Sequence, residues 1–386
     1  MKLEGWKKIV LFALIGVLLA GVFFAVYWVR VRQDMSDFGV CYRAGQRILW
    51  GETLYRTTDG HLQYKYAPVS ALFYAAFAWL PYEVGKFLWY CLELFCLFAG
   101  FWISHQCLPS PEKGKWFVIG WGLLISAKFI GREIELGQVN TVIIFILVSM
   151  LAAVLRKAEI LSGVLWGVSV FFKPYALVFL PYFLLKKRFK IIFSGLAVLV
   201  LGLFIPILIF GWHGNVLVLK EWVKTLSIST PVLLAVSDNA SLFAFLLKII
   251  GPGHQVWVDV LYGAVFASLA AAFLWMMWLG KKNGLEKPET LEAAYLFTLI
   301  PLFSPLGWYY NYLYAFPAVV LLLNSVGRFS PVHKYILAGN FIIIAASLRE
   351  VLGKTLFRFY NRKSLMVVNY LIVLFYLGYA RWKRRA

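Results

Sequence analysis

Charged residues are scarce in this sequence, and acidic residues are the scarcest of them. Charged side chains make up 15% of the 386 residues and hydrophobic ones 62%, whereas a soluble domain is about one quarter charged and one half apolar. A long polar interval is also lacking, so neither a soluble protein nor an additional soluble domain is expected. Repeated apolar runs between short polar breaks predict an all-α, polytopic bundle of transmembrane helices instead.

Cysteine and histidine are also few. The four cysteines show neither disulfide nor metal-ligand spacing, so we expect them to pack among apolar side chains. The histidines in polar segments, His61, His213 and His254, lack metal-ligand spacing as well. The sequence predicts no metal site and no cofactor, although Asp34 and Asp37 leave a weakly held divalent cation open.

The scarcity of acidic residues leaves the chain strongly basic. Thirty-eight lysines and arginines against 18 aspartates and glutamates give a formal net charge of +20. In a membrane protein this excess is typical of cytoplasmic loops and of contacts with anionic headgroups. We therefore expect membrane lipids, and no nucleic acid, to be the partners of these cations.

The apolar runs define about twelve candidate spans. They cover roughly residues 8–29, 67–81, 86–104, 116–130, 138–155, 159–185, 190–210, 255–279, 291–304, 308–326, 334–348 and 364–380. We expect a single integral membrane domain over residues 1–386, with a first external loop at 30–66 that carries a short amphipathic interfacial helix. The helical bundle then covers 67–348, and a basic loop plus the last span covers 349–386.

Basic clusters predict which ends of the spans are cytoplasmic. These clusters are Lys7-Lys8, 186–190, Lys281-Lys282, Arg328 with Lys334, and 381–385. From residue 186 onward they place 211–239, 305–308 and 349–363 outside. The run 159–185 contains Lys173-Pro174 and is either one kinked span or two short ones, which leaves the side of Gln138 open.

The polar stretch "SDFGVCYRAGQRILWGETLY" (36–55) predicts the interfacial helix. Apolar residues recur at helical spacing, Ser36 is the expected N-cap, and Gly51 is the expected stop. Asp37 falls in the first turn, where the helix dipole favours an ionised carboxylate that can act as a general base toward a hydroxyl. The alternatives are that Asp37 only caps the helix while the arginines bind lipid phosphates, or that Asp34 is the base.

From Ser36 onward the sequence resembles the membrane glycosyltransferases of family 87 in the GT-C superfamily. The resemblance continues through "YKYAP", "GQVN" (137–140), "KP" (173–174), "NASL" (239–242) and "SPLGWYYN" (304–311), and covers roughly residues 30–325. Relatives in this family are the polyprenol-phosphate-mannose-dependent mannosyltransferases of phosphatidylinositol mannoside synthesis. Two motifs depart from the family pattern: Tyr66-Ala67-Pro68 replaces a "YPP"-like turn, and tyrosines and Asn311 follow Trp308 where histidines are usual.

The resemblance implies an inverting glycosyltransferase with Asp37 as the base. It implies transfer of a sugar, mannose or another hexose or pentose, from a polyprenyl-phosphate donor to a hydroxyl of a glycolipid or glycan acceptor. The expected location is the bacterial or archaeal cell membrane, with the active site on the extracytoplasmic face and no nucleotide sugar or soluble cofactor. A flippase or transporter of lipid-linked sugars, or a ligase or polymerase of polyprenyl-diphosphate glycans, are the alternatives.

Further residues are candidates for binding donor or acceptor. Lys173 lies deep in an apolar run, where an ammonium is costly and usually functional. Arg349 and Arg358 belong to a basic segment that either binds the donor phosphate or marks a misplaced span boundary. The other candidates either bind sugar or act as helix caps and interfacial aromatics: Tyr64, Tyr66, Gln138, Asn140, Asn239, Ser241, Trp308, Tyr309 and Tyr310.

Overall fold

A computed structural model describes residues 5–383, and these form helices joined by short turns. The expected cytoplasmic cluster at 381–385 lies partly outside the described residues. The elements in chain order are α1 (Gly5–Val26), the π-helical η1 (Tyr27–Val31), α2 (Ser36–Leu49), η2 (Thr57–Leu62), α3 (Ser70–Ala78), α4 (Tyr82–Gln106), α5 (Lys115–Leu136), α6 (Asn140–Leu155), α7 (Glu159–Phe172), η3 (Pro174–Val178), α8 (Phe179–Leu185), α9 (Phe189–Phe204), α10 (Ile207–Leu233), α11 (Leu242–Ile250), η4 (Pro252–His254), α12 (Gln255–Lys282), α13 (Pro288–Phe303), η5 (Tyr309–Ala315), α14 (Phe316–Ser325), η6 (Val326–Arg328), α15 (Pro331–Ala346), α16 (Arg349–Arg362) and α17 (Met366–Lys383).

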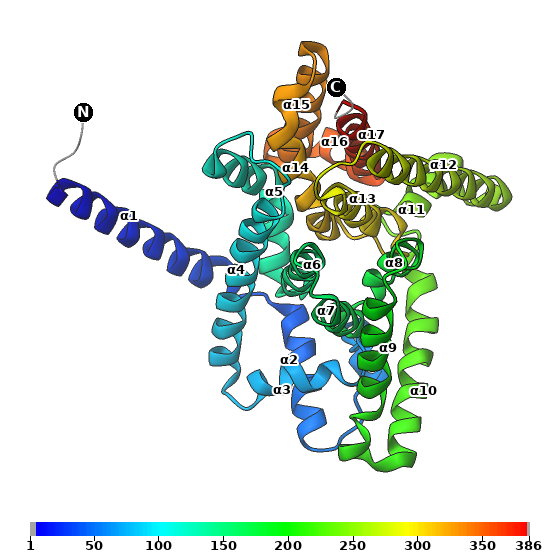
Figure 1. Cartoon of the computed structure of the whole chain (residues 1–386). Helices are drawn as coiled ribbons and strands as arrows, with labels where there is room; N and C mark the ends of the chain where they lie inside the picture. The colour runs from blue at the N-terminus through cyan, green and yellow to red at the C-terminus, as the bar shows by residue number, and fades with distance from the viewer. Residues whose placement is uncertain (1–4, 384–386) are drawn as a thin grey trace.

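Three apolar helices form the centre of the bundle. Every residue of α14 is buried, as are most residues of α6 and α13. A helix that is apolar on all sides needs such surroundings, either protein or lipid. By contrast, α1 and α12 extend away from the body (Figure 1) and expose apolar side chains along their length, as lipid-facing helices do. The expected all-α helical bundle is confirmed.

Among the described residues, two single helices, α4 and α12, are long and apolar enough to cross a membrane. Three further pairs of helices, each bent by more than 40°, bring the count to five if each pair is one span. The number of twelve spans therefore stays a prediction. The candidate span 67–81 is wrong in its length, because α3 has 9 residues and reaches less than half the ~30 Å hydrocarbon thickness.

Two segments expected as external loops are helical. Residues 211–239 lie mostly in α10, which has a kink at Gly211, and 349–363 lie in α16, which follows α15 after a 94° bend. Both segments mix polar and apolar residues, a composition that allows an amphipathic helix but gives no continuous apolar run. The two helices reach the same cavity as Asp37, so all three lie on one side of the bundle.

The run 159–185 is broken rather than continuous. α7 ends at Phe172, Lys173 is extended with φ −146° and ψ 134°, and Pro174 begins η3. Proline disfavours the helical region for the residue before it, which explains the break at this position. The structure therefore favours two short elements, with Lys173 at their junction.

Close packing of α7 on α9 fixes the helix that ends directly before Lys173. Gly163 and Gly167 form a small-xxx-small pair, the pattern that lets helices in membranes approach closely. A Cβ on Gly163 would lie 2.3 Å from the carbonyl oxygen of Ile191, and one on Gly195 would lie 2.3 Å from the ring of Trp166. Neither contact leaves room for a methyl group.

We expect Gly163→Ala to destabilise the protein by roughly 1–3 kcal/mol, because the added methyl meets backbone that cannot move aside. Thermal unfolding of the purified protein in detergent measures the effect. Gly120→Ala in α5 is the matched control, since a Cβ there meets nothing within 4 Å. Equal melting temperatures for the two variants would contradict the packing described for α7 and α9.

Candidate active site

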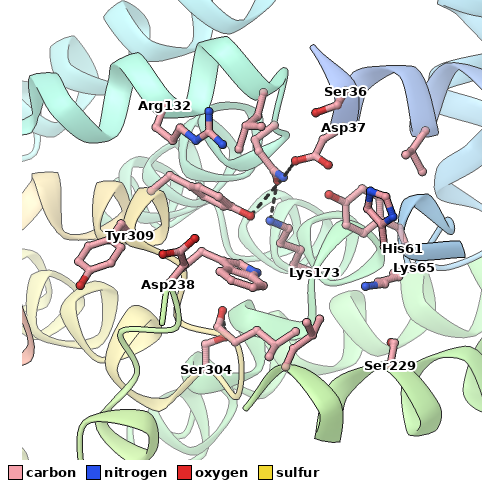
Figure 2. A pocket seen from close by; sticks show the side chains of 18 of the residues that line it. Ser36, Asp37, His61, Lys65, Arg132, Lys173, Ser229, Asp238, Ser304 and Tyr309 are labelled. Atoms are coloured by element: carbon pink, nitrogen blue, oxygen red, sulfur yellow. Dashed lines mark hydrogen bonds between the residues drawn. The ribbon is translucent and has the colours of Figure 1, made fainter. Parts of the chain in front are cut away.

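A cavity of about 1420 Å³ opens on the side of the bundle where α2, α5, α7 and α10 meet. The polar side chains around it come from segments far apart in the sequence (Figure 2). Several predicted residues line it: Asp37, Tyr64, Tyr66, Gln138, Lys173, Trp308, Tyr309, Tyr310 and Arg349. The structure thus brings together residues that the sequence separates by more than 300 positions.

Asp37 points into the cavity from the first turn of α2. The helix begins after Met35, which has φ 54° and donates its backbone N–H to the carbonyl of Glu135 at 2.8 Å. The Asp34 carboxylate accepts the backbone N–H of Ser36 at 3.2 Å. The prediction of Ser36 as N-cap is therefore wrong: Asp34 supplies the capping oxygen, because the left-handed turn at Met35 brings it to the helix start. This leaves Asp37 available for the cavity.

The amide of Gln138 links Asp37 to Lys173. Its Nε2 donates to Oδ2 of Asp37 and, at 3.3 Å, to the hydroxyl of Tyr310, while its Oε1 accepts from Nζ of Lys173 at 3.1 Å. These contacts fix the orientation of the amide, and Figure 2 shows them as dashed lines. The preceding Gly137 has φ +67°, and a Cβ there would lie 2.7 Å from that of Phe38. Only glycine fits this turn between α5 and α6, which packs against the start of α2.

Lys173 is held from its other side by Asn140. Nζ donates to Oδ1 of Asn140 at 2.8 Å, and the Asn140 amide donates to Oε2 of Glu133 at 2.8 Å. Glu133 is fully buried and also accepts the backbone N–H of Thr141 at 3.2 Å, at the start of α6. Because a buried ammonium needs compensating negative charge, Glu133 and Asp37 together balance Lys173 through the two amides.

Aromatic rings complete the surroundings of Lys173. Its ammonium lies 5.7–5.9 Å from the ring centroids of Tyr66, Tyr175 and Tyr310, within the range of cation–π attraction. Tyr64 lies behind Tyr66 with its hydroxyl 2.6 Å from that of Ser70. Tyr309 donates to the carbonyl of Asn361 at 3.1 Å.

Burial raises the pKa of Asp37 above the ordinary aspartate range. The hydrogen bond from Gln138 and the positive charge of Lys173 act in the opposite direction, but burial is the larger effect. A carboxylate with a raised pKa is a stronger base than an exposed aspartate. The burial of Asp37 at the start of α2 therefore improves it as a proton acceptor.

Four of the predicted binding residues lie outside the cavity lining. Asn239 is fully buried: its amide donates to carbonyls of Leu234 and Pro305, and its oxygen accepts backbone N–H groups of Ser241 and Gly307. Ser241 caps α11 by accepting the N–H of Ala244 at 3.2 Å. The structure favours the capping alternative for this pair. The remaining two are Asn140, which is fully buried and acts through Lys173, and Arg358, which is exposed on α16.

One of the arginines of α2 that were considered as ligands of lipid phosphates faces the protein instead. Arg47 is buried and forms a bidentate ion pair with Asp59 at 2.5 and 2.9 Å, and it also donates to the carbonyl of Leu54. Arg47 therefore fastens the 54–59 loop to α2 instead of binding lipid phosphate. Arg43 remains exposed.

Sequence reasoning missed several residues of this site. Glu133 and Arg132 belong to "GREIEL", directly before the "GQVN" motif, and charges beside a motif at the end of an apolar run were the available signal. Lys128 lies one turn earlier on α5 and contacts Ser347. Lys65 lies between the two tyrosines of "YKY". Arg132, Lys128 and Lys65 all line the cavity.

The model of glycosyltransferase family 87 matches residues 64–305, more than half of the chain. The chain belongs to glycosyltransferase family 87. It is therefore a membrane glycosyltransferase, and the transport alternative is set aside. Gln138 and Lys173 lie within the segment that the family model matches, whereas Asp37 and Tyr310 lie outside it.

Curated relatives of this family 87 enzyme are mycobacterial. A polyprenol-phosphate-mannose-dependent alpha-(1-2)-phosphatidylinositol mannoside mannosyltransferase of Mycobacterium tuberculosis is 22% identical over 76% of this chain and 70% of its own length. The protein of the same description from Mycolicibacterium smegmatis is 23% identical over 82% of this chain and 75% of its own. Among solved structures, apo ArnT from Cupriavidus metallidurans aligns with 96% of this chain and 78% of its own, with a TM-score of 0.40 and 14% identity.

We expect Lys173→Met to abolish activity and also to destabilise the family 87 enzyme by about 2 kcal/mol. The loss of stability is smaller than for a direct buried ion pair, because Asn140 lies between Glu133 and Lys173 and the two charges are not in contact. Adding Glu133→Gln to Lys173→Met removes the uncompensated carboxylate and should recover much of the stability but none of the activity. Chemical denaturation and a transfer assay measure the two effects. Recovery of activity in the double variant would make Lys173 purely structural.

Proposed function

We propose that this enzyme transfers a sugar from a polyprenyl-phosphate carrier to a hydroxyl group of a glycolipid acceptor, with inversion at the anomeric carbon. The observation that supports this most directly is the Asp37 carboxylate held by Gln138 beside the buried ammonium of Lys173. A base for an acceptor hydroxyl and a cation for a phosphate lie on one cavity wall. The donor class follows from the names of the mycobacterial relatives, whose donor is polyprenol-phosphate-mannose, and mannose is the sugar we propose.

In the proposed reaction, the acceptor oxygen attacks the anomeric carbon from the face opposite to the phosphate. Asp37 takes the hydroxyl proton through its Oδ1, which accepts no hydrogen bond from any of the described residues, 5–383. The bond between the anomeric carbon and the phosphate oxygen breaks, and the electron pair leaves with polyprenyl phosphate. One direct displacement inverts the configuration at carbon, and no covalent enzyme intermediate is needed.

The leaving phosphate gains one negative charge in this step, from a diester with one charge to a monoester with two. Cations placed beside it stabilise the transition state more than the bound donor, which is the condition for acceleration. Lys173 and Arg132 both line the cavity and both carry positive charges that act on Asp37, so we assign the phosphate to them. Lys128 and Arg349 line the same cavity and extend this positive wall.

The acceptor side and the membrane side complete the proposal. The curated relatives act on phosphatidylinositol mannosides by name, so we propose a lipid-linked sugar as the acceptor. The positive-inside rule applied to the basic clusters supports our proposal that the cavity opens at the extracytoplasmic face of a bacterial or archaeal cell membrane. We propose that the reaction needs no cofactor, since a carboxylate base and fixed cations account for each step.

Asp37→Asn should abolish transfer, by roughly 10³-fold or more, while donor binding and folding are retained, because the amide keeps the shape but cannot accept the proton. Turnover of polyprenyl-phosphate mannose by the purified enzyme in lipid vesicles measures this. Asp34→Asn is the matched control, since asparagine also caps helices and transfer should remain near the wild-type rate. Full activity of Asp37→Asn with loss in Asp34→Asn would move the base to Asp34.

The raised pKa of Asp37 predicts a pH dependence of kcat/KM. The base works only when ionised, so the rate should fall as pH falls through a pKa that lies above the ~3.9 of an exposed aspartate. The acid limb is therefore expected at higher pH than for a solvent-exposed carboxylate. Circular dichroism at each pH checks that folding is intact. A rate that stays level down to about pH 4 would mean that a different group takes the proton.

A further inference from the structure

A further cation, Lys65, reaches the cavity from the side opposite to Arg132. Lys65 lies in the loop after η2, and Figure 2 shows its ammonium directed into the cavity, with Lys173 between it and Arg132. The donor phosphate is accounted for by Lys173 and Arg132. Lys65 is therefore a cation that the reaction as described above does not use.

The backbone around Lys65 is fixed on both sides. The Tyr55 hydroxyl donates to the carbonyl of Tyr66 at 2.6 Å, and the Trp222 indole N–H donates to the carbonyl of Lys65 itself at 3.0 Å. Gln63 also donates to the Thr225 hydroxyl at 3.3 Å. These contacts hold the loop against α10 and fix the backbone position from which the Lys65 side chain extends.

The ammonium of Lys65 has no hydrogen bond or ion pair with any residue in the described chain, 5–383. It is half-buried, and that burial lowers its pKa although the negative charge of Asp37 acts in the opposite direction, so the charge is held at a cost. A lysine that only covered a surface would extend its ammonium to water. An unpaired, half-buried cation at a fixed place in a substrate cavity is suited to an anionic ligand.

Ser229 offers a second donor beside it. Its hydroxyl oxygen is buried, has no hydrogen-bond partner among the residues that the structure describes, and belongs to a residue of α10 that lines the cavity. Trp222, Leu226 and Ser229 follow one another at spacings of four and three, so they share one face of α10. Since Trp222 binds the carbonyl of Lys65, this face is turned toward the Lys65 loop, and Figure 2 shows Ser229 on the same side of the cavity as Lys65.

Apolar side chains flank these two donors. Leu226 and Leu233 lie on the Ser229 face of α10 and line the cavity. An anion bound between Lys65 and Ser229 would thus have apolar surface beside it, as the headgroup of a lipid requires. A free phosphate ion would gain nothing from these leucines.

We propose that Lys65 and Ser229 bind the phosphodiester of the acceptor lipid, which makes them determinants of specificity for an anionic, lipid-linked acceptor. The inference rests on the proposed function, because it takes Asp37 as the base and the Arg132 side as the place of the donor. The donor phosphate and the acceptor phosphodiester then lie on opposite sides of Lys173. The acceptor hydroxyl reaches Asp37 between them.

The experiment measures binding to the purified full chain in neutral detergent, so that it does not depend on transfer. The probes are dioctanoyl phosphatidylinositol, its neutral counterpart dioctanoylglycerol, and geranylgeranyl phosphate as a short polyprenyl phosphate. Lys65→Met and Ser229→Ala are compared with Lys224→Met and Ser227→Ala, which change exposed residues of α10 outside the cavity lining. Arg132→Met serves as the converse variant.

We expect Lys65→Met to weaken phosphatidylinositol binding by about tenfold or more, as for loss of a charge-assisted hydrogen bond. Ser229→Ala should weaken it less. Dioctanoylglycerol binding and the control variants should be unchanged, and geranylgeranyl phosphate should be weakened by Arg132→Met but not by Lys65→Met. Both lipids should bind the wild type together. Unchanged phosphatidylinositol binding in Lys65→Met, or competition between the two anionic lipids, would overturn the proposal.

Steady-state kinetics separate the acceptor from bulk lipid. Lys65→Met should raise KM for phosphatidylinositol mannoside and leave both the donor KM and the KM for a neutral mannosyl diacylglycerol unchanged. Weakened lipid binding with an unchanged acceptor KM would assign the site to ordinary anionic phospholipid and refute the acceptor role. Absence of transfer by the wild type would refute the proposed function, while the binding measurements would still decide whether Lys65 and Ser229 form an anion site.

Discussion

The amide of Gln138 is the interaction on which the site depends. In a direct ion pair, Asp37 and Lys173 would neutralise each other. A neutral amide between them orients both groups and leaves each with a free hydrogen-bonding position. Asp37 keeps Oδ1 for an incoming proton, and Lys173 has donated two of its three N–H bonds, to Gln138 and Asn140. The third remains for a ligand. The orientation of the Gln138 side chain thus positions both the proposed base, Asp37, and the proposed phosphate-binding cation, Lys173.

Irregular backbone makes this arrangement possible inside a membrane protein. α2 starts after a left-handed residue, α5 ends just before Gly137, α7 ends just before Lys173, and η5 follows the turn at Trp308. Broken backbone at membrane depth is tolerated where it is buried in protein or lines a cavity. The buried carboxylate of Glu133 accepts the backbone N–H of Thr141 at the start of α6. Helix ends, rather than helix faces, therefore carry the polar groups of the site.

The sequence predicts those parts of the site whose signal is local. Asp37 follows from the start of an amphipathic helix, Lys173 from the cost of an ammonium in an apolar run, and Gln138 from its motif. The pairing of Arg47 with Asp59 and the location of Ser229 beside Lys65 depend on loop and helix packing, which no local pattern reports. α10 was expected as a loop because its polar residues interrupt every long apolar run. Amphipathic helices at the cavity are thus harder to predict than buried ones such as α14.

The neutral link between base and cation also has a consequence for the proposed reaction. Before transfer, Asp37 and Glu133 together compensate Lys173, and the donor phosphate adds a further negative charge. When Asp37 takes the acceptor proton it becomes neutral, in the same step in which the leaving phosphate gains a charge. The positive charge of Lys173 is then no longer balanced by Asp37 and stabilises the phosphate instead, and neither side chain has to move. Catalysis requires interactions that are stronger in the transition state than in the ground state. The attraction between Lys173 and the phosphate strengthens as Asp37 is neutralised, and this lowers the barrier. A direct Asp37–Lys173 ion pair would have to break first.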